Sequence, residues 1–265
     1  MLRQASREAR FVLHLVKLNL ASNMEYRVSF LSQVFGMMIN NGIYFVFWLL
    51  FFDRFEEIRG YQMDEIFMLF AVITFSYGLA YTFAGNATRV AELIAQGRLD
   101  YYLALPRPVL PHLVFSRMGQ STIGDLTFGV IAYLFTGRFD LPSLALFVVS
   151  SLLVAVIFIA FAVTIGSFAF FLGNASLLSR QLMNVLLTFS LYPFGLFQGV
   201  VRLILLTLVP AAFVGAVPVQ VVQAFDLGAL ALLAGVTCLM VCVMLGMFRL
   251  GLRRYESGNA MNVNL

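Results

Sequence analysis

One carboxyl group inside an apolar stretch is the side chain of this chain best placed to do chemistry. Asp125 lies within residues 112–136, which contain no other Asp or Glu. A charged side chain at the centre of a bilayer costs roughly 2.5–3.5 kcal/mol on insertion scales, so an acid there needs an explanation. Two interpretations stay open: a cation-binding or proton-linked group in a polar cavity, or a neutral acid hydrogen-bonded to a neighbouring helix.

A second set of polar residues lies at helical spacing in the first long apolar stretch. Ser29, Gln33, Gly36 and Asn40 follow one another at steps of four, three and four, which places them on one helix face. Such a stripe fits a subunit interface or a cavity wall. Tyr192 precedes Pro193 and marks an expected kink. The predicted pathway or interface residues are therefore Gln33, Asn40, Asp125 and Tyr192.

The segment 87–111 has the pattern of a short amphipathic helix followed by a stiff turn. Val90, Leu93 and Ile94 form an apolar stripe at helical spacing, and Gly97 is the expected end of the helix. The prolines that follow, Pro106, Pro108 and Pro111, are expected to prevent further regular helix. Such an element fits a socket on a partner protein, although a surface helix that simply closes a loop is the alternative.

The inventory of catalytic groups is poor. The chain has two histidines, His14 and His112, far apart in the sequence, and no Ser/His/Asp or metal-ligand spacing. It has no Gly-x-x-x-x-Gly-Lys-Ser/Thr loop, and Lys17 is its only lysine, so it cannot itself cradle the phosphates of ATP. We therefore expect no enzyme, and no catalytic, cofactor-binding or metal site in this chain.

The composition indicates an all-α integral membrane protein that positions these residues on spanning helices. Hydrophobic residues make up 61% of the chain and charged residues 11%, which is too little polar surface for a soluble globule. A crossing needs about 20 apolar residues. Six such stretches form one membrane domain over residues 1–265, at 28–52, 65–86, 112–136, 144–171, 178–197 and 227–247.

The distribution of positive charge predicts the orientation. Of the 17 Lys and Arg residues, 13 fall on the side of the termini and the other 4 on the opposite side. The excess of positive charge marks the cytoplasmic face, so both termini are expected there. The basic residues are dispersed at helix ends, which favours contact with anionic lipid and a cytoplasmic partner over nucleic acid.

Two further segments are expected to lie along the membrane rather than cross it. Residues 1–27 predict a basic amphipathic helix at the membrane interface, either a simple anchor or a lever between a partner and the first crossing. Residues 198–225 are apolar, but Pro210, Gly215 and Pro218 divide them into pieces too short for a crossing. We predict a re-entrant or interfacial hairpin on the outer side.

Three short motifs, each in its expected topological place, carry a resemblance that covers the whole chain. They are Gly97-x-Leu99-Asp100-x-x-Leu103 with Pro106, Pro210-Ala211-Ala212-Phe213 with Pro218, and Arg254-Tyr255-Glu256-Ser257-Gly258-Asn259. With these motifs the chain resembles the permease subunits of type-2 ABC transporters, in a multidrug or exporter permease branch of the ABC-2 family.

The resemblance implies a permease in a bacterial inner membrane, coupled in trans to two ATPase subunits that hold ATP and Mg and paired with an identical or homologous second permease. It also implies a coupling helix between the second and third crossings. The residues expected to couple to the ATPase are Glu92, Gly97, Arg98, Leu99, Asp100, Leu103 and Pro106, with Arg98 and Asp100 as ion-pair candidates, and those of the outer hairpin are Pro210, Phe213 and Pro218.

The competing interpretation is an ion-coupled secondary transporter or a channel subunit. That class predicts inverted repeats and several charges within the membrane. The two halves show no convincing repeat, and Asp125 is the one buried acid that the sequence predicts. We therefore expect an ATP-driven exporter whose substrate is a hydrophobic or amphipathic small molecule, a lipid or a glycan.

Overall fold

The computed structural model describes the backbone of residues 2–58 and 60–256, and the side chains among these from residue 10 onward. The described elements are helical except for one isolated bridge between Ile58 and Tyr61. In chain order they are α1 Leu2–Glu25, α2 Arg27–Phe52, α3 Met63–Phe83, η1 Gly85–Arg89, α4 Val90–Ala95, α5 Leu99–Leu103, α6 Val109–Phe115, α7 Thr122–Phe135, α8 Leu141–Gly166, α9 Ala169–Leu172, α10 Ser176–Ser190, η2 Phe194–Leu196, α11 Gly199–Thr207, α12 Ala211–Val214, α13 Ala216–Ala224 and α14 Leu227–Leu252.

Four helices of the described chain are long and apolar enough to cross a membrane. They are α2, α3, the run Leu141–Leu172 formed by α8 and α9, and α14. The pair of α11 with α12–α13 passes the same test together but is bent by 64°. Helices α7 and α10 have 14 and 15 residues and are shorter than the ~20 that a perpendicular crossing needs.

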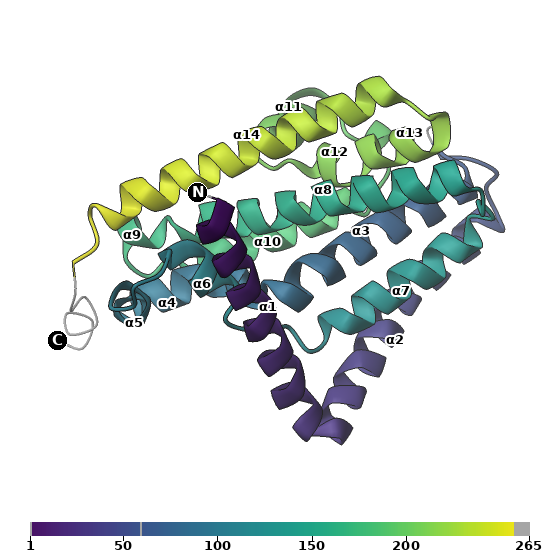
Figure 1. Cartoon of the computed structure of the whole chain (residues 1–265). Helices are drawn as coiled ribbons and strands as arrows, with labels where there is room; N and C mark the ends of the chain where they lie inside the picture. Colours follow the sequence, from purple (N-terminus) through teal and green to yellow (C-terminus); the bar gives the residue numbers. More distant parts are fainter. Residues whose placement is uncertain (1, 59, 257–265) are drawn as a thin grey trace.

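Helix α3 is the centre of the bundle and packs between α7 and α8 (Figure 1). Its sequence is apolar around most of its circumference, which is the pattern of a helix buried on all sides. A Cβ on Gly78 of α3 would lie 2.4 Å from the backbone nitrogen of Leu126, and one on Gly129 would lie 2.5 Å from that of Phe75. Glycine on each helix therefore lets α3 and α7 pack backbone against backbone.

The predicted crossing at 112–136 is not one helix. It divides into α6 and α7, with residues 116–121 between them. The Gly119 N–H donates to the Tyr81 carbonyl oxygen at 2.9 Å, and the Gly85 N–H donates to that of Arg117 at 2.9 Å. These bonds hold the interrupted segment against the end of α3, so the backbone there is paired with another part of the chain rather than within a helix.

The proline-rich turn also differs from the prediction. Helix α6 begins at Val109 and includes Pro111 in its first turn. Proline is tolerated there because the first backbone N–H groups of a helix have no partner within it. The segment after Gly97 therefore contains two short helices, α5 and α6, instead of an irregular loop.

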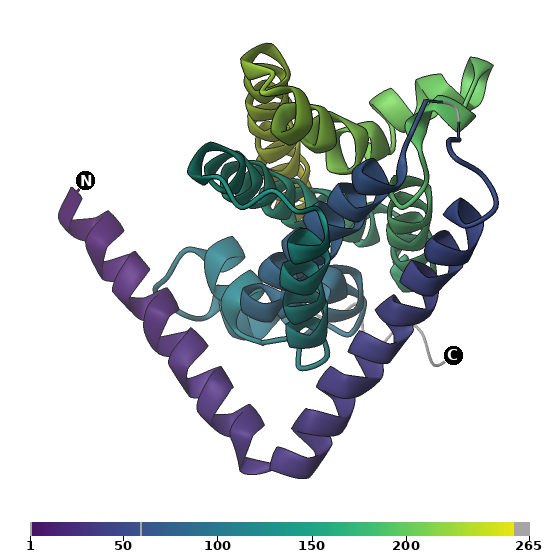
Figure 2. The same ribbon diagram turned by 90° about the vertical axis from the view of Figure 1, so that its right-hand side faces the viewer.

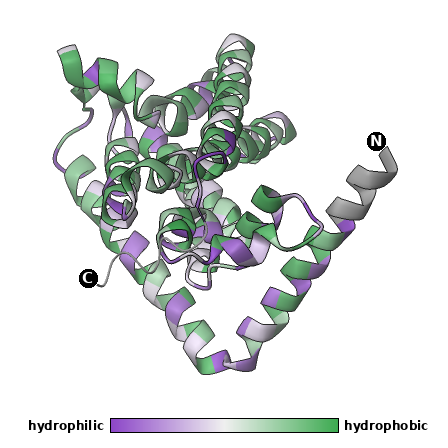
Figure 3. Cartoon of the chain, turned by 90° about the vertical axis from the view of Figure 1, so that its left-hand side faces the viewer, coloured by the Kyte–Doolittle hydropathy of each residue, from purple (hydrophilic) through white to green (hydrophobic). Residues whose placement is uncertain are grey.

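Helices α1 and α2 form a V whose tip points away from the bundle, while α2 packs along α7 (Figures 1 and 2). Tyr26 separates them, with φ −100° and ψ 64°. The expected helix within residues 1–27 is present as α1, and Figure 3 shows hydrophilic residues at intervals along it. Helix α1 contacts the bundle at α6, where the Phe11 ring meets His112 edge-on at 5.1 Å between centroids.

The other predicted bounds differ by a few residues because local caps set the helix ends. Helix α8 begins at Leu141 rather than 144, since the Asp140 carboxylate accepts a hydrogen bond from the Ser143 N–H at 2.9 Å. Asp226 caps α14 through the Ala229 N–H, and α14 begins at Leu227 as predicted but continues to Leu252 rather than 247. Helix α10 ends at Ser190, seven residues before the predicted end at 197. In the predicted hairpin, Pro218 lies inside α13 rather than between two helices.

Candidate functional site

Asp125 is buried at the middle depth of the bundle. It lies in the first turn of α7, not midway along a helix as predicted, but its neighbours Asn41 and Thr74 lie near the middles of α2 and α3. Its side chain is 2% exposed. The Asn41 Nδ2 donates to Oδ1 at 2.7 Å, and Oδ2 has no hydrogen-bond partner among the described residues. Oδ1 therefore has a hydrogen-bond donor within the subunit, and Oδ2 can accept one from a further group.

Asp125 lines a cavity of about 430 Å³ between α2, α3, α7 and α10, which we call the aspartate pocket. Its walls combine polar and aromatic groups, and none of the described residues that line it is Lys, Arg or His. The lining residues are Met37, Asn40, Asn41, Tyr44, Phe70, Ile73, Thr74, Tyr77, Asp125, Asn184, Leu187, Thr188 and Leu191.

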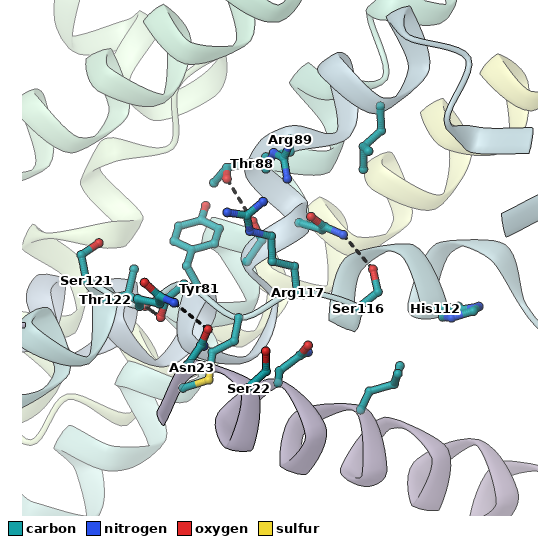
Figure 4. A pocket seen from close by; sticks show the side chains of 18 of the residues that line it. Ser22, Asn23, Tyr81, Thr88, Arg89, His112, Ser116, Arg117, Ser121 and Thr122 are labelled. Atoms are coloured by element: carbon teal, nitrogen blue, oxygen red, sulfur yellow. Dashed lines mark hydrogen bonds between the residues drawn. The ribbon is translucent and has the colours of Figure 1, made fainter. Parts of the chain in front are cut away.

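A second cavity, of about 860 Å³, lies between α1, the end of α3 and the segment 85–122 (Figure 4). We call it the arginine pocket, because Arg89, Arg98 and Arg117 line it and none of its described lining residues is acidic. Side-chain amides frame it, with Gln120 Nε2 donating to Asn23 Oδ1 at 2.7 Å and Asn86 Nδ2 donating to Ser116 Oγ at 2.7 Å. The break between α6 and α7 forms one of its walls.

Tyr77 of α3 lines both pockets. The arginine pocket ends near the beginning of α7, where Ser121 and Thr122 line it. Asp125 lies one turn further along the same helix. The two cavities are thus neighbours in depth and share Tyr77 as a lining residue.

The predicted polar stripe of α2 is divided between the two pockets. Gln33 lines the arginine pocket and donates through Nε2 to Gln120 Oε1 at 2.7 Å, whereas Asn40 lines the aspartate pocket. Tyr192 lines neither, and its ring lies 6.0 Å from that of Trp48. Asn41, the partner of Asp125, was not predicted. The sequence did hold a clue, because two adjacent asparagines in an apolar helix point to different faces, and one of them, Asn41, faces the bundle.

The segment 87–111 has the predicted helix stop. Helix α4 ends at Ala95, and Gly97 has φ +68°, a conformation that glycine adopts without strain. The Arg89 guanidinium donates two hydrogen bonds to the Glu92 carboxylate at 2.9 and 3.0 Å, and this contact holds the pKa of Glu92 below its ordinary value.

Burial separates the predicted coupling residues into three groups. Leu99 is fully buried, so it holds the segment to the bundle and cannot contact a partner directly. Arg98, Leu103 and Pro106 are exposed, together with Tyr101. Glu92, Gly97 and Asp100 are partly exposed.

The chain just after α14 meets this segment, so the described part of the C-terminal motif, residues 254–256, lies beside the Gly97–Leu103 motif. Ser257, Gly258 and Asn259 of that motif lie outside the described residues. The Asp100 carboxylate is next to the Tyr255 hydroxyl, and burial together with this carboxylate raises the pKa of Tyr255 to about 12. The Tyr255 ring packs edge-on against Phe170 at 5.9 Å.

The Pro210-Ala211-Ala212-Phe213 motif lies at the other end of the bundle from α5. Pro210 precedes α12, Phe213 lies within it and packs on the core, and Pro218 is in the first turn of α13. Both prolines are buried. These residues shape the bend of the α11–α13 segment.

Comparison with protein families matches residues 38–259 to the ABC-2 family transporter proteins. The match covers more than half of the chain. The chain belongs to the ABC-2 family. Curated proteins and solved structures give no match.

Membership of the ABC-2 family makes the chain a multi-pass membrane protein and a permease component of an ABC transporter. ABC-2 permeases work with separate ABC ATPase components, which supply ATP hydrolysis. In this family context both pockets belong to the membrane component. Among the described residues, no three His, Cys, Asp or Glu side chains come together as a metal site.

Proposed function

We propose that the chain is the permease subunit of an ATP-driven exporter in a bacterial inner membrane. Two separate ATPase subunits hold ATP and Mg, and a second permease, identical or homologous, completes the membrane part. The observation that carries this proposal is the ABC-2 family match over residues 38–259. The substrate is a hydrophobic or amphipathic molecule, in keeping with pockets that lie within or beside apolar helices.

The proposed topology has six crossings, formed by α2, α3, α7, α8 with α9, α10 and α14. Helix α7 is short enough to need the interrupted segment 116–121 to complete its crossing. An even number of crossings places both ends of the chain on one side, and the positive charge assigns that side to the cytoplasm. The arginine pocket then opens to the cytoplasm, and the bent α11–α13 segment is an outer re-entrant hairpin.

The pathway in this proposal runs between the two permeases, along a face formed by α2 and α10. Asn40 on α2 and Asn184 and Thr188 on α10 are all exposed in the single chain. Exposed amides and hydroxyls at mid-depth are costly in lipid, so they call for protein or water against them. A second permease across this face supplies that cover, and the aspartate pocket opens toward it.

The ATPase docks, in this proposal, on the exposed surface of α5 and the turn after it. Tyr101 and Leu103 present apolar side chains there that are 63% and 43% exposed. Arg98 and Asp100 add opposite charges beside them, as groups that set the orientation of a partner. Leu99 and Tyr255 hold the element to the rest of the subunit, so a movement of the ATPase is transmitted to α4 and α14.

Purification of the tagged chain from native membranes in mild detergent, with mass spectrometry of the associated proteins, tests the proposal. We expect a P-loop ATPase in stoichiometric amount, with the same chain or a related permease. Absence of an ATPase, even after crosslinking, would contradict the exporter and favour an ion-coupled carrier or channel.

A substitution then tests the docking surface. Leu103→Asp places a charge on the exposed face of α5 and is expected to reduce co-purification of the ATPase at least about tenfold, because a charge in an apolar contact is desolvated. Leu141→Asp is the matched control, since Leu141 is exposed at the first turn of α8, at the other end of the bundle. Equal recovery with both variants would remove α5 from the interface.

A further inference from the structure

We infer that the aspartate pocket is a binding site for an organic ammonium ion, in which Asp125 pairs with the positive charge and the surrounding rings contact the apolar body. As a binding site this inference stands on the geometry of the pocket. As a site for the transported molecule it rests on the proposed function.

The free oxygen of Asp125 is the first argument. Oδ1 is bound by the Asn41 amide at 2.7 Å, which fixes the orientation of the carboxyl group. Oδ2 is buried and has no hydrogen-bond partner among the described residues, while the side chain as a whole lines the cavity. Buried polar atoms without a partner are rare in native structures and mark sites of function or of a bound group.

The charge of the lining is the second argument. Asp125 is an acid, and no basic side chain is present among the described residues around the cavity. Removing one partner of a buried ion pair costs several kcal/mol in general, so a lone acid gains most from a ligand that brings the missing cation. Among charged ligands, the pocket therefore favours a cation.

The size and the rings decide between a metal ion and an organic cation. A cavity of about 430 Å³ is within the range of sites for drug-sized molecules and far larger than a metal ion needs. A hard metal ion requires about six oxygen ligands, whereas one carboxylate and aromatic faces are typical of ammonium recognition. Tyr44, Phe70 and Tyr77 supply the aromatic groups.

The binding experiment uses the full chain in lipid nanodiscs and a matched pair of probes. Tritiated 1-adamantylamine and 1-adamantanol have the same apolar cage and differ in an ammonium against a hydroxyl group. Equilibrium dialysis, corrected with protein-free nanodiscs, gives the two dissociation constants. We expect the amine to bind at least tenfold more tightly than the alcohol. Equal binding of the two probes overturns the inference without any variant.

Two variants assign the effect to Asp125. Asp125→Asn keeps the shape of the side chain and removes its charge, so the preference for the amine should fall to within twofold. Asp53→Asn makes the same change at an exposed position at the end of α2 and should retain the full preference. An amine preference that survives in Asp125→Asn places the site elsewhere and overturns the inference.

Trp48 reports where the probe binds. It is the only tryptophan of the chain and lies one helical turn beyond Tyr44 on α2. Its fluorescence should change with amine concentration with the same midpoint as the dialysis, and should not respond in Asp125→Asn. The measurement needs no ATPase, so failure to bind amine leaves the result of the ATPase co-purification intact, and the reverse also holds.

Discussion

Helices α2 and α14 are equally long and similarly exposed, but their exposed faces differ in chemistry. Each has 26 residues. Of an 18-residue apolar stretch in each helix, only 17% of α2 and 11% of α14 is buried in the subunit. The exposed face of α2 includes the amides of Gln33 and Asn40, whereas the exposed residues of α14 from Leu227 to Val243 are Leu, Val, Ala, Gly and Cys. Exposure in a membrane subunit therefore has two meanings: α14 is suited to lipid, and α2 to protein or water.

The contact between the buried helices α3 and α7 contrasts with both exposed helices, and a substitution there has the largest expected effect. Gly78→Val places a side chain where Cβ alone would lie 2.4 Å from the Leu126 backbone, so α3 and α7 must separate. We expect a loss of about 3 kcal/mol or more in the free energy of unfolding. Thermal unfolding in detergent measures it. Gly235→Val on α14, where nothing lies within 4 Å, is the control and should change stability by less than about 1 kcal/mol.

The two neighbouring asparagines of α2 sharpen the comparison within one helix. Asn41→Leu removes the amide that binds Asp125 and should reduce stability by about 1–3 kcal/mol, because the acid then has no partner for either oxygen. Asn40→Leu changes an exposed side chain and should alter stability by no more than about 0.5 kcal/mol. Equal losses in the two variants would mean that the faces of α2 do not differ as described.

Glycines on the exposed faces test which helix meets a second permease. Gly36 on α2 and Gly235 on α14 both have open space around them in the single chain. Gly36→Leu should raise the dissociation constant of the permease pair by about tenfold, or 1.4 kcal/mol, whereas Gly235→Leu should leave it unchanged. Fluorescence energy transfer between labelled subunits in liposomes gives both constants. A larger effect at Gly235 would assign the interface to α14.

Water access is the smallest and most local test. A cysteine introduced as Asn40→Cys, in a background where Cys238 and Cys242 are replaced by serine, should react about tenfold faster with a water-soluble maleimide than Cys238 in the native chain. The reagent attacks the thiolate, which forms in a polar environment and not against lipid. Cys238 and Cys242 are both exposed on α14, so slow reaction there cannot be explained by burial within the subunit.

Much of this contrast could be predicted from the sequence, because it depends on periodicity and composition. The stripe through Gln33 and Asn40, the helix stop at Gly97 and the apolar run of α14 are all local patterns. The ABC-2 family was predicted differently, from a resemblance carried by three motifs that lie far apart in the chain, and the family comparison confirms it.

The remainder depends on contacts between distant residues. The break at 116–121 follows from backbone hydrogen bonds of Gly119 and Arg117 with residues at the end of α3, and no local pattern reveals such pairing. For the same reason the predicted position of Asp125 midway along its helix was wrong, and its partner Asn41, 84 positions away, was missed. The burial of Leu99 depends on packing that spacing alone does not show.

The shortness of α7 has an electrical consequence. Fourteen residues at a rise of 1.5 Å extend about 21 Å, against about 30 Å for the hydrocarbon layer, and the polar arginine pocket occupies depth beside its beginning. In the proposed orientation, the transmembrane voltage then drops mainly between Asp125 and the outer surface. A cation that leaves Asp125 outward moves against an inside-negative voltage and must be given about 2.3 kcal/mol for each 100 mV it crosses. For a cationic substrate, the ATPase therefore works against voltage as well as concentration, and the rate of export should fall as the membrane is polarised.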